Sequence, residues 1–182
     1  MKEAFPYRRI TVVGTTGSGK STLAGSIAHR LHIPYIELDA LHWEADWNHA
    51  SDEVMHQRVE AATRGPAWVV DGNYGIVRDI TWPRSQVLVW LDYPLMLAFR
   101  RLWRRTWKRW WTRELLWGVN QEHILMQFKF WSDDSLFRWF FKTYWRRTKN
   151  YAQLTTLPDN AHLKVFRFKS PREADAWLQG LE

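Results

Sequence analysis

Apolar residues gather in short uninterrupted runs along the chain, and stretches with helical spacing separate these runs. Five runs rich in β-branched and aliphatic residues predict strands, at residues 10–13, 35–38, 67–70, 86–91 and 163–168. Strands that are apolar at nearly every position are typical of a parallel sheet covered by helices on both faces. The pattern therefore predicts an α/β fold built on a parallel sheet.

The predicted helices carry start and stop signals. Residues 21–31 follow a glycine-rich turn and repeat leucine and isoleucine at helical spacing. Ser51 is placed to cap a second helix, which ends before Gly65. Near the C-terminus, Ser170 and Glu173 form a capping box with proline at the first helical position. Helices thus alternate with strands, as a parallel sheet requires.

A long segment, residues 94–159, separates the fourth and fifth predicted strands. Its first part repeats apolar residues on one helical face, which consists of Leu95, Phe99, Leu102, Trp103, Thr106 and Trp110. A second helical stretch covers residues 135–154. Because no internal repeat or low-complexity linker is present, we expect a mostly helical insertion within a single domain, residues 1–182.

Composition and charge narrow the class of protein. The chain has 182 residues, 46% hydrophobic and 25% charged, which fits one globular domain and excludes a disordered or fibrous chain. The net charge is +7, and residues 100–149 alone carry 13 basic and 4 acidic side chains, or +9, with eight of the 14 tryptophans. The chain contains no cysteine, signal sequence or long apolar run. These features predict a soluble cytoplasmic protein without disulfides or cysteine-bound metal.

A phosphate-binding motif follows the first predicted strand. The P-loop or Walker A pattern G-x-x-x-x-G-K-[ST] is matched by Gly14, Thr15, Thr16, Gly17, Ser18, Gly19, Lys20 and Ser21, and Thr22 comes next. The glycines let backbone N–H groups turn inward, and the following helix directs its positive end at the same point. Lys20 can neutralise the β- and γ-phosphates, while the Ser21 hydroxyl suits Mg²⁺. The motif predicts binding of ATP with Mg²⁺.

Two aspartates end apolar strands. Asp71 follows the third run, at the position where an acidic group helps to order the water shell of the metal in such folds. A simple turn-forming role is the alternative for Asp71. Asp92 ends the fourth run, but Pro94 follows closely, so the favoured interpretation is a role at the start of the next helix.

Taken in order, these segments resemble a known family. The P-loop, residues 38–43 (LDALHW), residues 68–74 (WVVDGNY) and the arginine-rich insertion are similar to those of the adenylate-kinase-related P-loop kinases. The likeness is greatest to small bacterial members often labelled DNA topology modulation proteins, and it covers nearly the whole chain.

The resemblance implies a three-layer P-loop NTPase fold with five parallel strands and the P-loop strand at the centre. It also implies a division of the single domain into three parts. These are a core of residues 7–93 and 160–182, an acceptor-binding arm at about residues 39–65, and a helical lid rich in arginine and tryptophan at about residues 94–159.

The resemblance further implies roles for arginines of the insertion. Arg101 falls where adenylate kinases stack an arginine on adenine, and Arg105 at the first lid arginine that contacts phosphate. Arg146 and Arg147 resemble the second lid arm, whose arginines neutralise the migrating phosphoryl group. Residues 104–145 are longer and richer in tryptophan than the adenylate-kinase lid, so only Arg101 and Arg105 carry over directly. A solvated basic helix face is the alternative for the other arginines.

The acceptor arm is acidic. Residues 36–53 contain six Asp and Glu side chains and no Lys or Arg. A nucleoside monophosphate brings about two negative charges, and kinases that act on it hold these charges with arginines. The expected acceptor is therefore a neutral or cationic small molecule with a hydroxyl group. Asp39 is expected to take the proton of this hydroxyl, while Lys20 holds the phosphates of ATP. A plain cap at the strand end is the alternative for Asp39.

Further residues could contact the acceptor at the carboxyl edge of the sheet, where open parallel sheets bind ligands. Asn73 and Tyr74 follow the third strand and either reach the acceptor or serve as turn residues. His42 and Trp43 are placed to line the same pocket. Arg78 lies further along and could offset part of the negative charge.

Three functions compete on this sequence. The favoured one is an ATP-dependent phosphotransferase acting on a small molecule, with a nucleoside monophosphate kinase as its alternative. The second is a nucleic-acid-binding regulatory NTPase, because basic residues follow phosphate backbones and aromatic rings stack on bases. The third is a docking surface on the insertion for a partner or an anionic membrane. The oligomeric state is left open.

Overall fold

A five-stranded sheet forms the centre of the molecule. The computed structural model describes residues 5–72, 74–112, 115–116, 120–121 and 136–181. The sheet consists of β1 (Arg9–Gly14), β2 (Tyr35–Glu37), β3 (Trp68–Asp71), β4 (Val87–Leu91) and β7 (Lys164–Phe168). Their order is β2-β3-β1-β4-β7, and every neighbouring pair is parallel. The predicted five-stranded parallel sheet, with the P-loop strand at its centre, is confirmed.

Helices connect the strands and cover both faces of the sheet. They are α1 (Lys20–Leu31), α2 (Leu38–His42), α3 (Asp52–Ala62), α4 (Arg78–Arg84), α5 (Leu95–Thr112), α7 (Leu136–Leu154) and α8 (Pro171–Gln179). Short 3₁₀ helices occupy η1 (Ala45–Trp47), η2 (Gly75–Val77) and η3 (Pro158–Asn160). A small hairpin, β5 (Leu115–Leu116) and β6 (Asn120–Gln121), lies in the insertion. The expectation of a mostly helical insertion is confirmed for α5 and α7.

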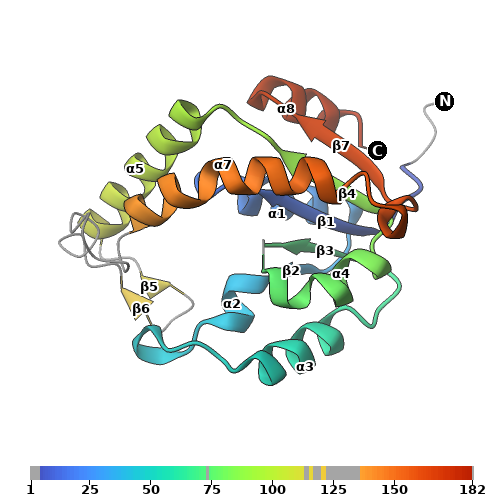
Figure 1. Ribbon diagram of the computed structural model, residues 1–182, viewed down its shortest axis with the longest axis horizontal. Coiled ribbons are helices and arrows are strands. Elements are labelled where there is room, and N and C mark those ends of the chain that lie inside the picture. The colour runs from blue at the N-terminus through green and yellow to red at the C-terminus, as the bar shows by residue number, and fades with distance from the viewer. Residues whose placement is uncertain (1–4, 73, 113–114, 117–119, 122–135, 182) are drawn as a thin grey trace.

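The hydrophobic core has a layer on each side of the sheet. On one face, Ile10 and Val12 pack with the buried side chains of α1 and with Ala174 of α8. On the other face, Met55 of α3 packs under β3, while Trp82 of α4 and Tyr151 of α7 pack against β4. These strand residues are buried on both faces because each face carries its own helices. The molecule is therefore a three-layer α/β structure (Figure 1).

The two helix caps predicted from the sequence are present. The Ser51 hydroxyl accepts a hydrogen bond from the backbone N–H of Val54 at 3.3 Å, at the start of α3. The Ser170 hydroxyl accepts one from Glu173 N–H at 3.4 Å, and the Glu173 carboxylate accepts one from Lys169 N–H at 2.8 Å. Each bond satisfies an N–H group that has no partner within its helix, so these caps fix where α3 and α8 begin.

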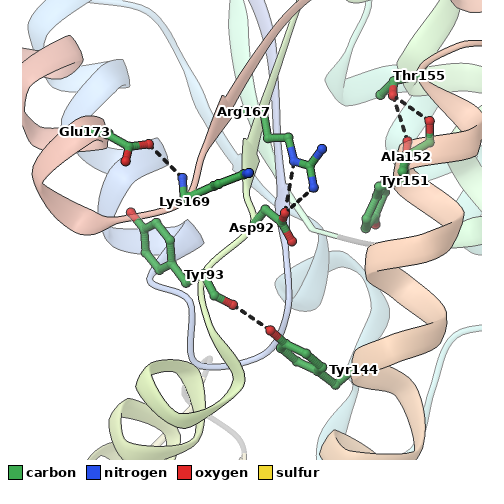
Figure 2. A network of polar contacts seen from close by, with 9 residues as sticks. All are labelled: Asp92, Tyr93, Tyr144, Tyr151, Ala152, Thr155, Arg167, Lys169 and Glu173. Atoms are coloured by element: carbon green, nitrogen blue, oxygen red, sulfur yellow. Dashed lines mark hydrogen bonds and ion pairs between the residues drawn. The ribbon is translucent and has the colours of Figure 1, made fainter.

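The structure corrects two expectations about how strands end. Strand β2 ends at Glu37, and Leu38, expected in the strand, begins α2 instead. The Leu38 side chain packs so closely on Gly72 that a Cβ added to Gly72 would lie 2.7 Å from the Cβ of Leu38. Asp92 does not serve the start of α5. Its carboxylate accepts two hydrogen bonds from the Arg167 guanidinium, at 2.9 and 2.5 Å, and so joins the ends of β4 and β7 (Figure 2).

The first helix of the insertion also differs in one detail from its expected apolar face. Leu102 and Thr106 are fully buried, as expected, but Trp110 is 40% exposed. The buried stripe instead continues toward Ala98, where α5 contacts the P-loop. In Figure 1, α5 lies at the left edge of the molecule, and α7 begins near its end and runs across the sheet. The rings of Phe99 and Phe140 join the two helices at a centroid distance of 5.9 Å.

Candidate active site

The P-loop forms a compact turn between β1 and α1. Gly17 and Gly19 have φ values of 80° and 93°, in the left-handed region that favours glycine. The Ser18 N–H donates to the Thr15 carbonyl at 3.1 Å. Gly17 lies so close to α5 that a Cβ added there would be 2.3 Å from the carbonyl oxygen of Ala98. The glycines in the motif are therefore required both by the loop conformation and by contact with α5.

A cavity of about 410 Å³ lies beside the P-loop. The loop and the start of α1 line it with Gly17, Ser18, Gly19, Lys20, Ser21 and Thr22; α5 contributes Arg101, Arg105 and Arg109; and α8 contributes Ala174, Asp175 and Leu178. Its size suits a nucleotide, and the N-terminus of α1 opens into it. The other predicted loop residues, Gly14, Thr15 and Thr16, do not line this cavity.

Lys20 lies among charged groups that come from four different elements. Burial lowers the pKa of its ammonium group, while Asp71 and Asp39 raise this pKa and Arg147 and Arg105 lower it further. The ammonium donates to the Thr15 carbonyl of its own loop at 3.4 Å. The structure therefore brings the predicted residues Lys20, Asp39, Asp71, Arg105 and Arg147 into one electrostatic cluster.

Asp71 is almost completely buried at the end of β3, with 3% of its surface exposed. Burial raises the pKa of its carboxyl group, and Lys20 and the Ser21 hydroxyl oppose this shift. The Tyr35 hydroxyl donates to Oδ2 of Asp71 at 3.4 Å, whereas Oδ1 is buried without a hydrogen-bond partner. A buried acceptor oxygen without a partner is costly, which indicates a group that a ligand would satisfy.

The surroundings of Asp71 fit a magnesium ion. Mg²⁺ in phosphate sites is held by one or two protein oxygens, together with phosphate oxygens and water. Ser21 and Asp71 are oxygen donors of this kind beside the P-loop, and Oδ1 of Asp71 is the oxygen that lacks a bond. In the described part of the chain, no group of three or more His, Asp or Glu side chains is placed to hold a metal ion by itself.

Asp39 lies in α2 and is held by Tyr74. The Tyr74 hydroxyl donates to Oδ1 of Asp39 at 2.7 Å. Burial and the Asp39 carboxylate both raise the pKa of Tyr74, so this phenol stays a donor at neutral pH. Asp39 in turn raises the pKa of Lys20, which places the two groups near each other across the site. The hydrogen bond from Tyr74 therefore holds one oxygen of the Asp39 carboxylate in place.

Three aromatic side chains gather beside Asp39 and come from α2, the residue after it and the loop after β3. The His42 ring lies 4.6 Å from that of Tyr74 and 5.0 Å from that of Trp43, measured between centroids. His42 also stacks on His49 at 5.6 Å, and burial together with His49 lowers its pKa. The predicted residues His42, Trp43 and Tyr74 therefore do gather beside Asp39.

The arginines near the arm are already engaged within the protein. Arg58 donates to the Leu41 carbonyl and to the Glu44 carboxylate, both at 2.8 Å. Arg78, predicted to contact the acceptor, lies over the Trp82 ring at 5.3 Å and hydrogen-bonds to Tyr151. Neither arrangement presents a guanidinium to an acceptor phosphate. Asn73, the remaining predicted acceptor residue, lies outside the described residues.

The arginines of α5 and α7 separate into different roles. Arg101 donates to the Ser18 carbonyl at 3.0 Å and lies 5.5 Å from the centroid of the Tyr93 ring, so it supports the P-loop as well as lining the cavity. Arg147 is partly buried against the Trp139 ring at 4.3 Å, and burial lowers its pKa while Asp39 opposes the shift. Its neighbour Arg146 is exposed and is not part of this cluster.

Sequence reasoning missed three residues of the site. Arg109 lines the cavity one helical turn beyond Arg105, and the spacing of 101, 105 and 109 could have revealed it. Tyr93 lies under Arg101, and Tyr35 bonds to Asp71 from the start of β2. No local pattern marks either tyrosine, because their roles depend on contacts between elements that are distant in sequence.

Comparisons with known proteins agree with this architecture. The family model described as "ATPase family associated with various cellular activities (AAA)" matches residues 10–70, about a third of the chain. No curated protein matches. Among solved structures, shikimate kinase from Bacteroides thetaiotaomicron is similar, with a TM-score of 0.54 and 18% identity, covering 96% of each chain.

Two further solved structures show the same likeness. A sugar kinase from Janibacter sp. HTCC2649 has a TM-score of 0.52 and 18% identity, covering 97% of this chain and 95% of its own. A gluconokinase from Sinorhizobium meliloti 1021 has a TM-score of 0.52 and 19% identity, covering 98% and 95%. The chain therefore has the three-layer fold of P-loop NTPases, which these small kinases share.

Proposed function

We propose that the protein is an ATP-dependent phosphotransferase that moves the γ-phosphoryl group of ATP to a hydroxyl of a small molecule. The observation that carries the proposal is the position of Asp39. Its carboxylate is held by Tyr74 at 2.7 Å and lies close enough to the P-loop lysine to raise its pKa. A carboxylate facing a phosphate-binding loop is the arrangement that phosphoryl transfer to a hydroxyl requires.

The proposed reaction assigns a task to each group. Lys20 and the loop N–H groups hold the β- and γ-phosphates, while Asp39 accepts the proton of the acceptor hydroxyl. The acceptor oxygen then forms a bond to the γ-phosphorus as the bond from that phosphorus to the ADP oxygen breaks. Arg105 and Arg147 spread the negative charge that develops on the transferring group. Ser21 and Asp71 would hold Mg²⁺, which when bound would neutralise further phosphate charge.

The charge of the acceptor arm supports a neutral or cationic acceptor. Arg58 is tied to Leu41 and Glu44, and Arg78 to Trp82 and Tyr151. A nucleoside monophosphate therefore meets Asp39 without arginines aimed from the arm to offset its charge. The names of the structures with a similar fold, shikimate kinase, sugar kinase and gluconokinase, also favour a small-molecule acceptor over a nucleotide.

This proposal agrees with the resemblance to the adenylate-kinase-related kinases and to the small bacterial proteins labelled DNA topology modulation proteins. In the same proposal, residues 39–65 act as the acceptor arm and residues 94–159 as the lid of a single domain. A cytoplasmic location fits an enzyme that consumes ATP. Within the described residues, no helix has the length and apolar character needed to cross a bilayer.

A panel of acceptors tests the substrate class. ADP release is measured with Mg·ATP and, in turn, sugars, amino sugars, other neutral or cationic alcohols, hydroxy acids and nucleoside monophosphates. We expect a neutral or cationic alcohol to accelerate ADP release well above the basal hydrolysis of ATP. Acceleration by a nucleoside monophosphate alone would establish the alternative, a nucleotide kinase.

Replacing Asp39 tests its proposed role. With the acceptor found by the panel, Asp39→Asn should lower kcat about 100-fold to 10,000-fold, because the hydroxyl proton loses its acceptor. ATP binding measured by calorimetry should change less than about twofold, since the P-loop is untouched. Asp46→Asn is the matched control, because Asp46 is an exposed carboxylate of the same arm. A kcat unchanged by Asp39→Asn removes Asp39 from the mechanism.

A further inference from the structure

The outer surface of α5 and α7 carries large aromatic side chains that the proposed active site does not use. The exposed rings are Trp107, Trp110, Trp111, Phe141 and Trp145, and Trp111 and Trp145 are 80% and 69% exposed. Indole and phenyl rings of this size are normally buried. Several of them on one surface therefore indicate a contact with another body.

Ring contacts join these aromatics into one continuous surface across the two helices. Phe141 of α7 touches Phe99 of α5 at 5.1 Å, and Phe99 touches Trp103 at 6.1 Å, between centroids. From Trp103 the contacts continue along α5 through Trp107, Trp110 and Trp111, at 6.2, 5.4 and 6.4 Å. Trp145 lies one helical turn from Phe141 on α7.

Positive charge surrounds the aromatic surface. Six exposed cations flank it, three on each helix: Arg100, Arg104, Lys108, Lys142, Arg146 and Lys149. Neither helix contains an Asp or Glu side chain. We call this surface, formed by the five exposed rings and these six cations, the outer face. Arg101, Arg105 and Arg109 point instead to the nucleotide cavity, so nucleotide binding does not account for the outer face.

We propose that the outer face binds the surface of an anionic phospholipid membrane, with α5 and α7 lying along it. Helices that lie in a membrane interface combine tryptophan with lysine and arginine, so that rings enter the headgroup region and cations meet anionic lipid. The cytoplasmic leaflet supplies such a negative surface. The outer face offers both kinds of group on two contacting helices, of which α5 lies at the edge of the molecule (Figure 1).

Geometry favours a membrane over a nucleic acid as this partner. Proteins that bind single strands combine a basic groove with rings whose flat faces are spaced for bases. Here Trp107 packs edge to face on Trp110, and Trp110 on Trp111, so neighbouring rings are not parallel faces on which successive bases could stack. Neither the nucleotide cavity nor the adjoining hollow along α1 is lined by an outer-face residue. A broad surface of packed indoles suits a lipid headgroup layer better than a strand of bases.

Co-sedimentation of the full chain with vesicles tests the proposal. One vesicle type contains equal parts of phosphatidylglycerol and phosphatidylcholine, and the other contains phosphatidylcholine alone. We expect binding to the anionic vesicles to be at least about tenfold tighter, and to weaken at high salt because the charge contribution is screened. Lipids brominated on the acyl chain should quench part of the tryptophan fluorescence, which requires rings at the interface.

Two pairs of substitutions locate the binding to the outer face. Trp111→Ser with Trp145→Ser removes the two most exposed tryptophans, and Arg104→Glu with Lys142→Glu reverses one cation on each helix. Each double variant should weaken vesicle binding at least about tenfold. For the charge reversal, this expectation follows from a loss of about fivefold for each surface cation. The control pair, Lys164→Glu with Arg172→Glu, makes the same change of charge at exposed positions on β7 and α8, and should change binding less than threefold.

Three outcomes overturn the proposal. The first is that the protein does not bind anionic vesicles. The second is that the outer-face and control variants lose vesicle affinity equally. The third is that the protein binds an oligodeoxythymidine strand but not the vesicles. The last would assign the outer face to nucleic acid. Calorimetric ATP binding by every variant confirms that it is folded, so a lost membrane contact is distinguished from a lost fold.

Discussion

At the level of single residues, the site places charged groups at buried and half-buried positions. Asp71 is buried at the end of a strand, and Lys20 lies beside it at the start of α1. Burial opposes the charged form of both groups, raising the pKa of the carboxyl and lowering that of the ammonium. Both shifts mean that the charges weaken the folded state. Such a cost is typical of charged groups that are positioned for a functional site and not for stability.

Asp71→Asn tests this cost through its pH dependence. In the folded protein, the pKa of Asp71 lies above its usual value of 3.8. Protonation of Asp71 therefore stabilises the folded state, and this stabilisation is complete at pH values below 3.8. This stabilisation is lost as the pH rises through the folded pKa, so ionised Asp71 is unfavourable at neutral pH. Without ligands, the variant should melt a few degrees above the wild type near neutral pH, because it removes a buried charge that weakens the folded state.

Differential scanning calorimetry from about pH 4 to about pH 7.5 checks this prediction. The gap in Tm between variant and wild type should shrink toward the acid end, where both proteins carry a neutral side chain. Adding Mg·ATP should raise the Tm of the wild type more than that of the variant. A variant that melts below the wild type at neutral pH would contradict the assigned direction.

Among the elements, the contact between the P-loop and α5 is the tightest one near the site. The positive φ of Gly17 and its approach to the Ala98 carbonyl leave no space for a side chain. Arg101, one turn further along α5, bonds to the Ser18 carbonyl. The loop therefore receives its shape from α5 as well as from its own sequence.

Gly17→Ala and Gly25→Ala form a matched pair that tests this contact. A Cβ at Gly17 meets backbone at 2.3 Å, whereas a Cβ at Gly25, inside α1, meets nothing within 4 Å. Gly17→Ala should lower the Tm by at least about 4 °C, because left-handed strain alone costs roughly 1–2 kcal/mol, and should weaken ATP binding more than about tenfold. Gly25→Ala should raise the Tm by about 2–4 °C, since alanine favours a helix by about 1 kcal/mol. If the two substitutions change the Tm and the calorimetric ATP affinity equally, the proposed contact of Gly17 with α5 is contradicted.

The sequence predicted the elements well where local chemistry defines them. The strands, the caps at Ser51 and Ser170 and the P-loop glycines follow from patterns within a few residues. The end of β2 was wrong by one residue, because Leu38 turns into α2 to pack on Gly72, a contact across the chain. Whether Arg146 or Arg147 faces the site depends on the rotation of α7, which its buried rings set.

At the level of the whole molecule, the long helix α7 links the site to the core at two points. The Tyr144 hydroxyl donates to the Tyr93 carbonyl at 2.9 Å (Figure 2). Two turns further on, the Tyr151 ring packs against Trp82 at 6.1 Å and Trp90 at 5.9 Å. Arg147 lies between these two attachments, so the same contacts that hold α7 on the sheet also determine where its guanidinium lies.

Tyr144→Phe tests whether α7 positions Arg147 in this way. The substitution leaves the buried Tyr93 carbonyl without its donor, which should cost about 1–2 kcal/mol and lower the Tm by about 2–8 °C. Turnover should fall severalfold as Arg147 loses its fixed position, whereas ATP affinity, set by the loop and α5, should change less than about twofold. Tyr7→Phe is the control, because Tyr7 contacts the Phe5 ring and packs on the core cluster of α1 and α8, which contains no residue of α7. If Tyr144→Phe lowers Tm but leaves kcat unchanged, the attachment is structural only, and Arg147 is positioned by Trp139 and Tyr151 instead.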